Sequence, residues 1–289
     1  MKGLQNLGNT CYFNTALQCL LQVPQLSNFL IMKKLNGVQC EFTREYQKLV
    51  KQMWLNKTNR IENPQKLFNI FKKKFKQFNN TEQQDSHEMI VCFLDALDIS
   101  LRPFRPVHFP SNSKDHSIIR EIFYGQIIQE VVTPQGKTKS FEDTTCLMMF
   151  LSHNTTLERC MTDYTKWNFL DNYKDDNGNH QQVTTTRHMF WYTPYILIMS
   201  FKMYTGKFKI KLPETFDVTP WIHPDSSHRK NTQYKLFGTC THYGSTRGGH
   251  YVSYVCHHGR WYLKDDTLVE QLQGPPLDEY QYVVFYKSI

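Results

Sequence analysis

A change of hydrophobic period near residue 103 limits the possible folds of this chain more than any other feature. Up to Arg102, apolar residues recur at the three- and four-residue spacing of helices. Beyond a proline-rich segment that begins at Pro103, they alternate or form short β-branched runs, as strands do. The sequence therefore predicts an α+β protein with a helical N-terminal lobe and a β-rich C-terminal lobe. A cleft between two such lobes is a natural place for a functional site.

Periodic segments place the individual elements. Helices are predicted to start at about residues 11, 41, 63 and 81, and Pro24 is expected to end or redirect the first. The fourth is expected to start at Thr81, because Thr81 and Gln84 have the spacing of a capping box. Strands are predicted at about residues 118–132, 195–201, 208–212, 234–241, 250–257, 260–264 and 280–286, with a polar turn within 174–186.

The composition excludes several classes of function. The net charge of +8 suits either an anionic partner or a solvated basic surface. No helix-turn-helix, zinc-finger or RNA-binding motif accompanies it, so we expect no nucleic-acid partner. No apolar run reaches the roughly 18 residues that span a bilayer, and the N-terminus lacks a secretory signal. We therefore expect no membrane partner and an intracellular location, in the cytoplasm, the nucleus or both. The 8 cysteines, none in a C-x-x-C pair, fit a reducing compartment.

Cys11 lies where the first predicted helix begins. The free N–H groups and the dipole at a helix start favour a thiolate, and can lower a cysteine pKa from about 8.5 to between about 3.5 and 7.5. A buried structural thiol would also suit this position. In the preceding turn, Gly8 allows close approach of a substrate. Asn6 either directs its side-chain N–H toward a developing oxyanion or only caps the turn.

His250 follows two glycines and begins a predicted strand. A turn at His258–Gly259 would pair this strand with residues 260–264, which are followed by Asp265. Asp265 would then lie across from His250 and accept its Nδ1–H. Cys11, His250 and Asp265 are thus candidates for nucleophile, base and orienting group.

Three segments resemble the ubiquitin-specific proteases, which are cysteine deubiquitinases. GLQNLGNTCYFNTALQCL resembles the cysteine box of that family, and TEQQDSHEMI its glutamine-aspartate segment. YKLFGTCTHYGSTRGGHYVSYV with WYLKDDTLV resembles its histidine box. The segments follow in the family's order, and the resemblance covers essentially the whole chain.

The resemblance implies one catalytic domain with a papain-like fold. Its parts would be a helical thumb (about 1–105), reduced β fingers with part of the palm (about 106–215), and a palm with the histidine box (about 216–289). It implies hydrolysis of the isopeptide or peptide bond after the C-terminal glycine of ubiquitin, without a cofactor. Ubiquitin and ubiquitinated proteins are the implied partners.

The resemblance also assigns catalytic roles. Cys11 matches the nucleophile, His250 the base, Asp265 the orienting residue and Asn6 the oxyanion residue. Asp266 matches a neighbouring acidic residue that has a role in some members.

Other positions match residues that bind the substrate. Gln83 and Asp85 match residues that hold the ubiquitin tail, and Tyr251 matches an aromatic residue beside it. His242 and Gly244 match the start of a loop that gates the cleft. We expect Asp85 to act on arginines of the tail rather than on folding.

The chain departs from the family pattern in the fingers. Many members bind zinc there through two C-x-x-C pairs, whereas residues 125–190 contain only Cys146 and Cys160. His153, His180 and His188 are not paired either. Structural zinc needs four ligands, so we predict no metal site and expect sheet pairing and apolar packing alone to hold the fingers.

Two other functions remain open. One is a catalytically weak ubiquitin-binding module, although all three catalytic residues are present. The other is a protease for another ubiquitin-like modifier, since such modifiers can share the terminal Gly-Gly.

Overall fold

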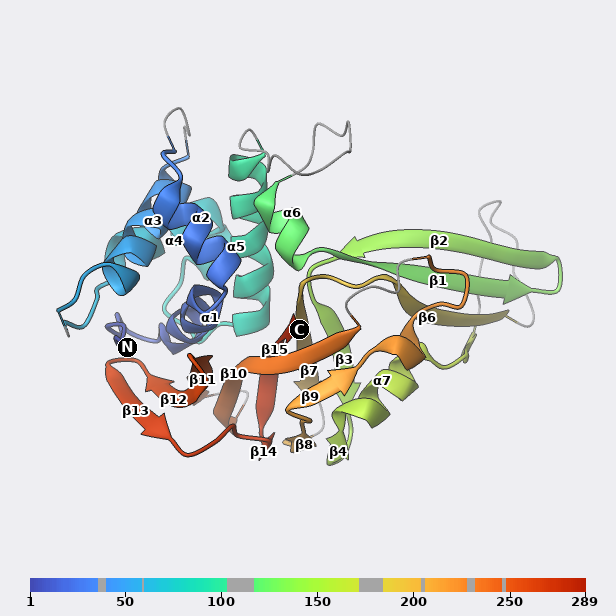
Figure 1. Cartoon of the computed structure of the whole chain (residues 1–289). Helices are drawn as coiled ribbons and strands as arrows, with labels where there is room; N and C mark the ends of the chain where they lie inside the picture. Colours follow the sequence, from blue (N-terminus) through green and yellow to red (C-terminus); the bar gives the residue numbers. More distant parts are fainter. Residues whose placement is uncertain are drawn as a thin grey trace.

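The computed structural model describes residues 1–35, 40–58, 60–102, 117–171, 184–203, 206–227, 232–245 and 248–289. Its N-terminal part is helical, as predicted (Figure 1). The helices there are α1 (Cys11–Leu21), α2 (Pro24–Met32), α3 (Glu41–Trp54), α4 (Gln65–Lys74), the short 3₁₀ helix η1 (Lys76–Phe78) and α5 (Ser86–Leu101). Every residue of α1 is buried, so this helix is the centre of the helical lobe.

The first helix ends before Pro24, as predicted, but one helix was not predicted and another begins later than predicted. Pro24 begins α2, because proline fits the first turn of a helix, where its missing N–H is not needed. The helix α5 begins after Asp85 and not at Thr81. The Asp85 carboxylate accepts hydrogen bonds from the backbone N–H groups of His87 at 2.8 Å and Glu88 at 3.3 Å. This cap replaces the predicted capping box.

The largest sheet has eight strands. Seven follow the order β13-β12-β11-β10-β15-β7-β3, and β9 pairs with β10; all pairs are antiparallel except β3 with β7. Their bounds are β3 (Leu147–Leu151), β7 (Ile196–Met203), β9 (Thr215–Asp217), β10 (Gln233–Ser245), β11 (Gly248–His257), β12 (Arg260–Asp265), β13 (Leu268–Leu272) and β15 (Gln281–Ser288). The helix α1 packs against β11, and this contact brings the start of α1 to the sheet.

A four-stranded sheet projects away from the helical lobe (Figure 1). Its order is β2 (Gly136–Thr144), β1 (Gly125–Thr133), β6 (Thr184–Tyr192), β5 (Asn168–Leu170). The remaining elements are α6 (Ile118–Phe123), α7 (Leu157–Thr165), η2 (Thr219–Trp221) and a small sheet of β14 (Asp278–Glu279), β8 (Ile210–Lys211) and β4 (Thr155–Thr156). Most of the polar turn predicted within 174–186 lies outside the described residues.

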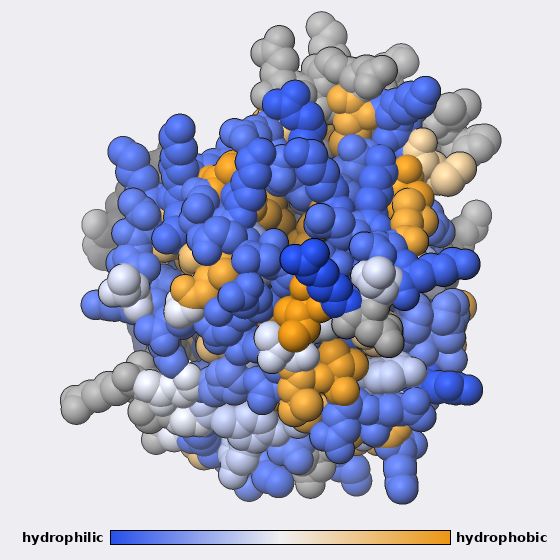
Figure 2. Space-filling model, turned by 90° about the vertical axis from the view of Figure 1, so that its left-hand side faces the viewer, coloured by the Kyte–Doolittle hydropathy of each residue, from blue (hydrophilic) through white to orange (hydrophobic). Residues whose placement is uncertain are grey.

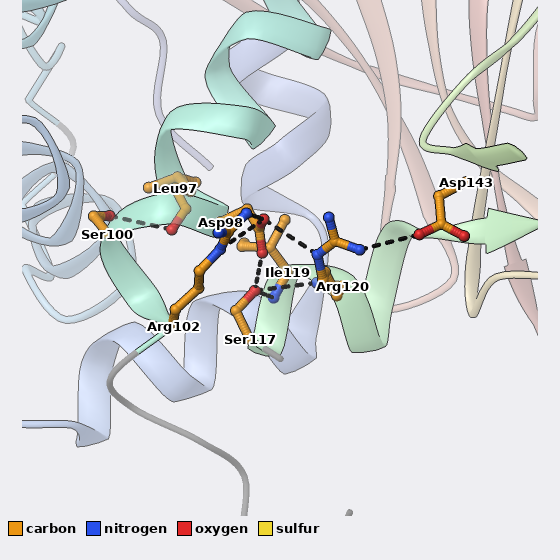
Figure 3. Close-up of polar contacts among 8 residues, drawn as sticks. All are labelled: Leu97, Asp98, Ser100, Arg102, Ser117, Ile119, Arg120 and Asp143. Atoms are coloured by element: carbon orange, nitrogen blue, oxygen red, sulfur yellow. Dashed lines mark hydrogen bonds and ion pairs between the residues drawn. The ribbon is translucent and has the colours of Figure 1, made fainter. Parts of the chain in front are cut away.

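The predicted strand at 118–132 was wrong over its first half, where α6 forms. Ser117 caps α6, accepting at Oγ from the N–H groups of Ile119 at 3.2 Å and Arg120 at 3.3 Å. The Ser117 hydroxyl itself donates to Asp98, which is fully buried at the end of α5 (Figure 3). The β-branched residues of this segment favour a strand, but these caps and tertiary contacts select a helix.

Asp98 joins the helical lobe to the projecting sheet (Figure 3). Its Oδ2 lies 2.9 Å from Arg102 Nη2 and 3.3 Å from Arg120 Nε. Arg120 continues to Asp143 on β2, with 3.1 Å between Nη1 and Oδ2. A buried carboxylate is thus paired with two guanidinium groups, which reduces the cost of burying its charge.

A second buried carboxylate corrects the view that sheet pairing and apolar packing alone hold the projecting sheet. Glu130 on β1 is fully buried. It forms ion pairs with Lys137 on β2 and with Arg187 on β6 at 2.5 Å, and His223 Nε2 lies 3.2 Å from its Oε1. Burial opposes ionisation of Glu130, but hydrogen bonds from these three partners outweigh it and lower its pKa to about 2. This charged cluster therefore connects β1 to both of its neighbouring strands, β2 and β6.

The apolar core has two parts, separated by the large sheet. One is formed by the helices and the sheet face toward them, and includes a group of aromatic rings around Phe71 and Phe93. The other lies around α7, β3, β7 and β15. No helix among the described residues is long and apolar enough to cross a membrane. Figure 2 shows one face of the molecule covered mainly by hydrophilic side chains, with hydrophobic ones in separate small patches.

Candidate active site

The loop before α1 is a tight turn that presents Cys11. Gly8 has φ 93° and Asn9 has φ 51°, and Gly8 suits such a conformation because it has no Cβ. Asn6 Oδ1 accepts from the N–H of Gly8 at 2.9 Å and from Thr10 Oγ1 at 3.2 Å. Thr10 is the N-cap of α1, so Cys11 is its first residue, as predicted.

The environment of the thiol differs from the one expected. Cys11 is 3% exposed, and burial raises its pKa above the ordinary value. Hydrogen bonds from the backbone N–H groups of Tyr251 and Tyr12 act in the opposite direction but are outweighed. The predicted lowering of the Cys11 pKa at the helix start is therefore wrong for this state, because desolvation outweighs the N–H groups.

His250 and Asp265 lie on the two strands of the predicted hairpin. His257 pairs with Arg260, and the turn residues His258 and Gly259 have φ 48° and 78°, as a two-residue turn of type I′ requires. His250 Nε2 lies 2.6 Å from Asp265 Oδ1.

Two details of this predicted contact were wrong. The histidine nitrogen at Asp265 is Nε2, not Nδ1. Since Ser253 pairs with Lys264, Asp265 is diagonal to His250 and not opposite it. Residues diagonal on one face of a sheet are still within reach of long side chains. The Nδ1 atom is the ring nitrogen that Asp265 leaves unengaged.

Asp266 has a different set of contacts from Asp265. Its Oδ2 accepts from Asn6 Nδ2 at 2.7 Å, and its Oδ1 accepts from Asn14 Nδ2 at 2.7 Å. Asp266 has φ 48°, a conformation that turns the chain after β12. One hydrogen of the Asn6 amide is thus given to Asp266, and an amide nitrogen carries two. Asp266 therefore contacts Asn6, the predicted oxyanion residue, directly.

The four predicted substrate-binding residues line one cavity. It has a volume of 710 Å³, and its walls include Gln83, Asp85, His242 and Tyr251. Gly244, predicted at the gating loop, lines it as well. The rings of His242 and Tyr251 are 4.4 Å apart between centroids. Burial, and then the charge of Lys207, lower the pKa of His242 to about 4, so this imidazole is neutral near pH 7.

Asp85 is more deeply tied into the protein than predicted. Besides capping α5, its Oδ2 accepts from Lys202 Nζ and, at 2.5 Å, from the Tyr282 hydroxyl. Burial opposes its ionisation, but hydrogen bonds from Lys202 and Tyr282 outweigh it and lower the pKa. The expectation that Asp85 has no part in folding is therefore wrong, because its carboxylate stabilises the start of α5.

Gln83, which lines this cavity, also contacts the start of β11. Its side-chain Nε2 donates to the carbonyl of Gly249, and its Oε1 accepts from the Gly249 N–H at 2.8 Å. The loop before α5 and the start of β11 are thereby joined beside His250.

One group of side chains has the spacing of metal ligands. Ligating atoms of His250, Asp265 and Asp266 all lie within 4.8 Å of one another, and this is the one such group found among the described residues. Hydrogen bonds already engage both carboxylates: Asp265 bonds to His250, and Asp266 accepts from Asn6 and Asn14. The described residues considered as zinc ligands in the fingers, Cys146, Cys160, His153 and His188, form no such group. His180 lies outside the described residues, and the absence of zinc remains a prediction.

Three residues of the site were not predicted. Lys202 and Tyr282 hold Asp85, and Asn14 holds Asp266. The sequence carries a signal for Asn14, since it is a polar residue one turn after Cys11 on the same face of the predicted helix. Lys202 and Tyr282 are far from Asp85 in the sequence, and no periodicity connects them.

Comparison with known proteins gives a consistent result. A family model described as "Ubiquitin carboxyl-terminal hydrolase" matches residues 2–286. The chain is 27% identical over 310 residues to ubiquitin carboxyl-terminal hydrolase 23 of Arabidopsis thaliana, covering 98% of this chain and 35% of that protein. It is 27% identical over 305 residues to ubiquitin carboxyl-terminal hydrolase 17-like protein 13 of Homo sapiens, covering 98% of this chain and 55% of that protein. The chain thus spans about a third to a half of these relatives.

Solved structures show the same fold. The SAGA Ubp8/Sgf11/Sus1/Sgf73 DUB module bound to ubiquitin aldehyde matches with a TM-score of 0.80 and 21% identity, covering 99% of this chain and 69% of the matched chain. A form of that module bound to monoubiquitin matches with a TM-score of 0.81 and 21% identity, with the same coverage. The predicted α+β, papain-like fold is confirmed.

Proposed function

Because this chain belongs to the ubiquitin carboxyl-terminal hydrolase family, we propose that it is a thiol-dependent deubiquitinase. Its reaction is hydrolysis of the peptide or isopeptide bond after the C-terminal glycine of ubiquitin. The proposal includes a single catalytic domain over residues 1–289, and ubiquitin and ubiquitinated proteins as partners. It also includes an intracellular location, which suits eight cysteines that are all free.

One observation carries the proposal. His250 and Asp265 are hydrogen bonded at 2.6 Å on a hairpin that packs against α1, and Cys11 is the first residue of α1. The backbone N–H of Tyr251, the residue after His250, reaches the Cys11 thiol. These contacts support Cys11 as nucleophile, His250 as base and Asp265 as orienting group, beside a cavity that Tyr251 lines.

The reaction follows from these positions. The ubiquitin tail lies in the cavity lined by Gln83, Asp85 and Tyr251. His250, oriented by Asp265 through Nε2, takes the thiol proton at Nδ1 as Cys11 attacks the glycine carbonyl. The free hydrogen of the Asn6 amide and the backbone N–H groups at the start of α1 bind the oxyanion. His250 then protonates the leaving amine and activates the water that hydrolyses the thioester.

Turnover of a ubiquitin C-terminal fluorogenic amide by the purified chain tests the proposal. We expect Cys11→Ala to abolish turnover and to retain ubiquitin binding, because the residues that line the cavity are unchanged. Cys92→Ala is a control: this half-buried thiol on α5 accepts a hydrogen bond from Gln77 and not from a residue of the site, so the variant should keep wild-type turnover. An inactive wild type, or an active Cys11→Ala, would refute the assignment.

The two other functions make different predictions. A ubiquitin-binding module without activity would bind ubiquitin but not react with a ubiquitin probe that carries a C-terminal electrophile. A protease for another modifier would react preferentially with a probe built on that modifier. A panel of such probes therefore separates all three functions.

A further inference from the structure

Asn14 occupies a buried position directly beside the catalytic groups. It lies one turn after Cys11 on α1 and is 2% exposed. Its Nδ2 donates to Asp266 Oδ1 at 2.7 Å and to the carbonyl of Gln5 at 3.2 Å. Two acceptors face one nitrogen, and this arrangement fixes which end of the amide points toward Asp266.

The other end of the Asn14 amide has no partner. Its Oδ1 is buried, and no described residue donates to it. A buried carbonyl oxygen without a hydrogen bond lowers stability. The contribution of Asn14 therefore lies in the two hydrogen bonds that its nitrogen donates, and one of them goes to the Asp266 carboxylate.

The Asp266 carboxylate connects Asn14 to Asn6. Asp266 Oδ2 accepts from Asn6 Nδ2 at 2.7 Å, while Oδ1 is held by Asn14. The backbone carbonyl of Asp266 accepts from the Leu4 N–H at 2.8 Å, which ties the residue to the segment before Asn6. The direction of the Asn6 amide thus depends on an Asp266 carboxylate that Asn14 orients.

We propose that Asn14 is a positioning residue for the oxyanion-binding amide of Asn6 and acts through Asp266. This assignment rests on the proposed function. The hydrogen bonds of the Asn14 side chain go to Gln5 and Asp266 and not to the Cys11 thiol. It holds the Asp266 carboxylate in one orientation, which leaves one hydrogen of the Asn6 amide directed at the site where negative charge develops.

Asn14→Leu tests the proposal, because leucine matches asparagine in size and lacks both the donor and the unpaired acceptor. We expect kcat to fall by about 10-fold or more, the scale of a misplaced catalytic group. The KM should change less than about 2-fold. The melting temperature should fall by no more than that of the control variant Gln18→Leu, because in both variants backbone or carboxylate acceptors lose a buried amide donor. The pH–rate profile should keep its shape, since neither His250 nor Asp265 contacts Asn14.

Gln18→Leu is a matched control. Gln18 lies one turn further along α1 and is also 2% exposed; it donates to the carbonyl of Lys2 at 3.0 Å and has an unpaired Oε1. It has no contact with Asp266, so its replacement should leave kcat unchanged. Equal losses of kcat in the two variants would show a general effect of α1 and overturn the proposal.

A double-mutant cycle shows whether Asn14 acts through Asn6. Asn6→Ala should lower kcat by about 100-fold, the scale of a lost oxyanion donor. Adding Asn14→Leu to Asn6→Ala should then cause little further loss, because no Asn6 amide remains to be positioned. The proposal is overturned if the fold losses of kcat in the two single variants multiply in the double variant. It is also overturned if Asn14→Leu alone leaves kcat unchanged. Should Asn14→Leu fail to fold, Asn14→Ala serves in the same cycle.

The activity of the wild-type chain distinguishes a failure of this proposal from a failure of the proposed function. If the wild-type chain does not turn over the ubiquitin substrate, both assignments are refuted together. If it does and Asn14→Leu is fully active, only the role of Asn14 is refuted.

Discussion

Cys11 combines two opposing influences at the scale of a single residue. The helix start and the N–H of Tyr251 favour a thiolate, whereas burial favours the neutral thiol and prevails. The sequence showed only the first influence, because it shows that a helix begins at Cys11 but not how deeply the thiol is buried. We therefore expect a resting thiol that His250 deprotonates during the reaction, and not a permanent thiolate–imidazolium pair.

The pH dependence of Cys11 alkylation measures this state directly. Only the thiolate reacts with iodoacetamide. Because the pKa of Cys11 is raised, its rate of inactivation should still be increasing with pH where an ordinary cysteine, such as that of glutathione, has levelled off. A rate that is already maximal at about pH 6 would instead show a resting thiolate.

Replacing Asp265 and replacing Asp266 should have different effects on catalysis. Asp265 contacts His250, so Asp265→Ala should lower kcat about 10-fold or more, while Asp265→Asn keeps a substantial part because an amide oxygen also accepts a hydrogen bond. Asp266 contacts Asn6 and Asn14. Asp266→Ala should therefore lower kcat without moving the pH–rate profile. The assignment is reversed if Asp266→Ala shifts the profile and Asp265→Ala leaves it intact.

At the scale of elements, the Glu130 cluster stabilises the projecting sheet. Its carboxylate is ionised in the folded protein down to about pH 2, compared with an ordinary pKa of 4.5. A folded-state pKa below the unfolded value gives stability that is present above about pH 4.5 and is lost as the pH falls toward about 2.

We expect Glu130→Gln to lower the free energy of unfolding at pH 7 by about 3 kcal/mol, because it breaks a buried ion pair. The difference between wild type and variant should shrink between about pH 4.5 and about pH 2, as wild-type Glu130 is protonated. Urea unfolding at several pH values measures this. Asp163→Asn, which breaks exposed pairs to Arg159 and Lys166, is a control that should cost less than about 1 kcal/mol. A difference that does not depend on pH would contradict the role of the charge.

The elements also show what local sequence could predict. The starts of α1 and α3 follow directly from periodicity, because their apolar faces are continuous. The start of α5 was misplaced, because Asp85 is fixed by Lys202 and Tyr282 from distant strands. The helix α6 was missed because its apolar, β-branched residues favour a strand locally, and only Ser117 and Asp98 show otherwise.

At the scale of the whole molecule, the fold class and the meeting of the cysteine and histidine boxes were predictable. Each box is a local pattern, and the packing of α1 against β11 brings the two together. The charged clusters at Asp98 and Glu130 were not predictable, because their members come from segments far apart in the sequence. The same holds for the contact of Asn14 with Asp266. Such contacts depend on the final arrangement of the chain, for which the sequence contains no periodic signal.

The contact between Gln83 and Gly249 has a consequence for selectivity. A side-chain amide offers the same donor and acceptor as a peptide group, so Gln83 satisfies the backbone of Gly249 as a neighbouring strand would. A peptide that used this backbone would exchange hydrogen bonds one for one and gain little net free energy from them. Discrimination among peptides at this point must therefore come from the shape and charge of their side chains. A short peptide without large or charged side chains would not displace Gln83 from Gly249.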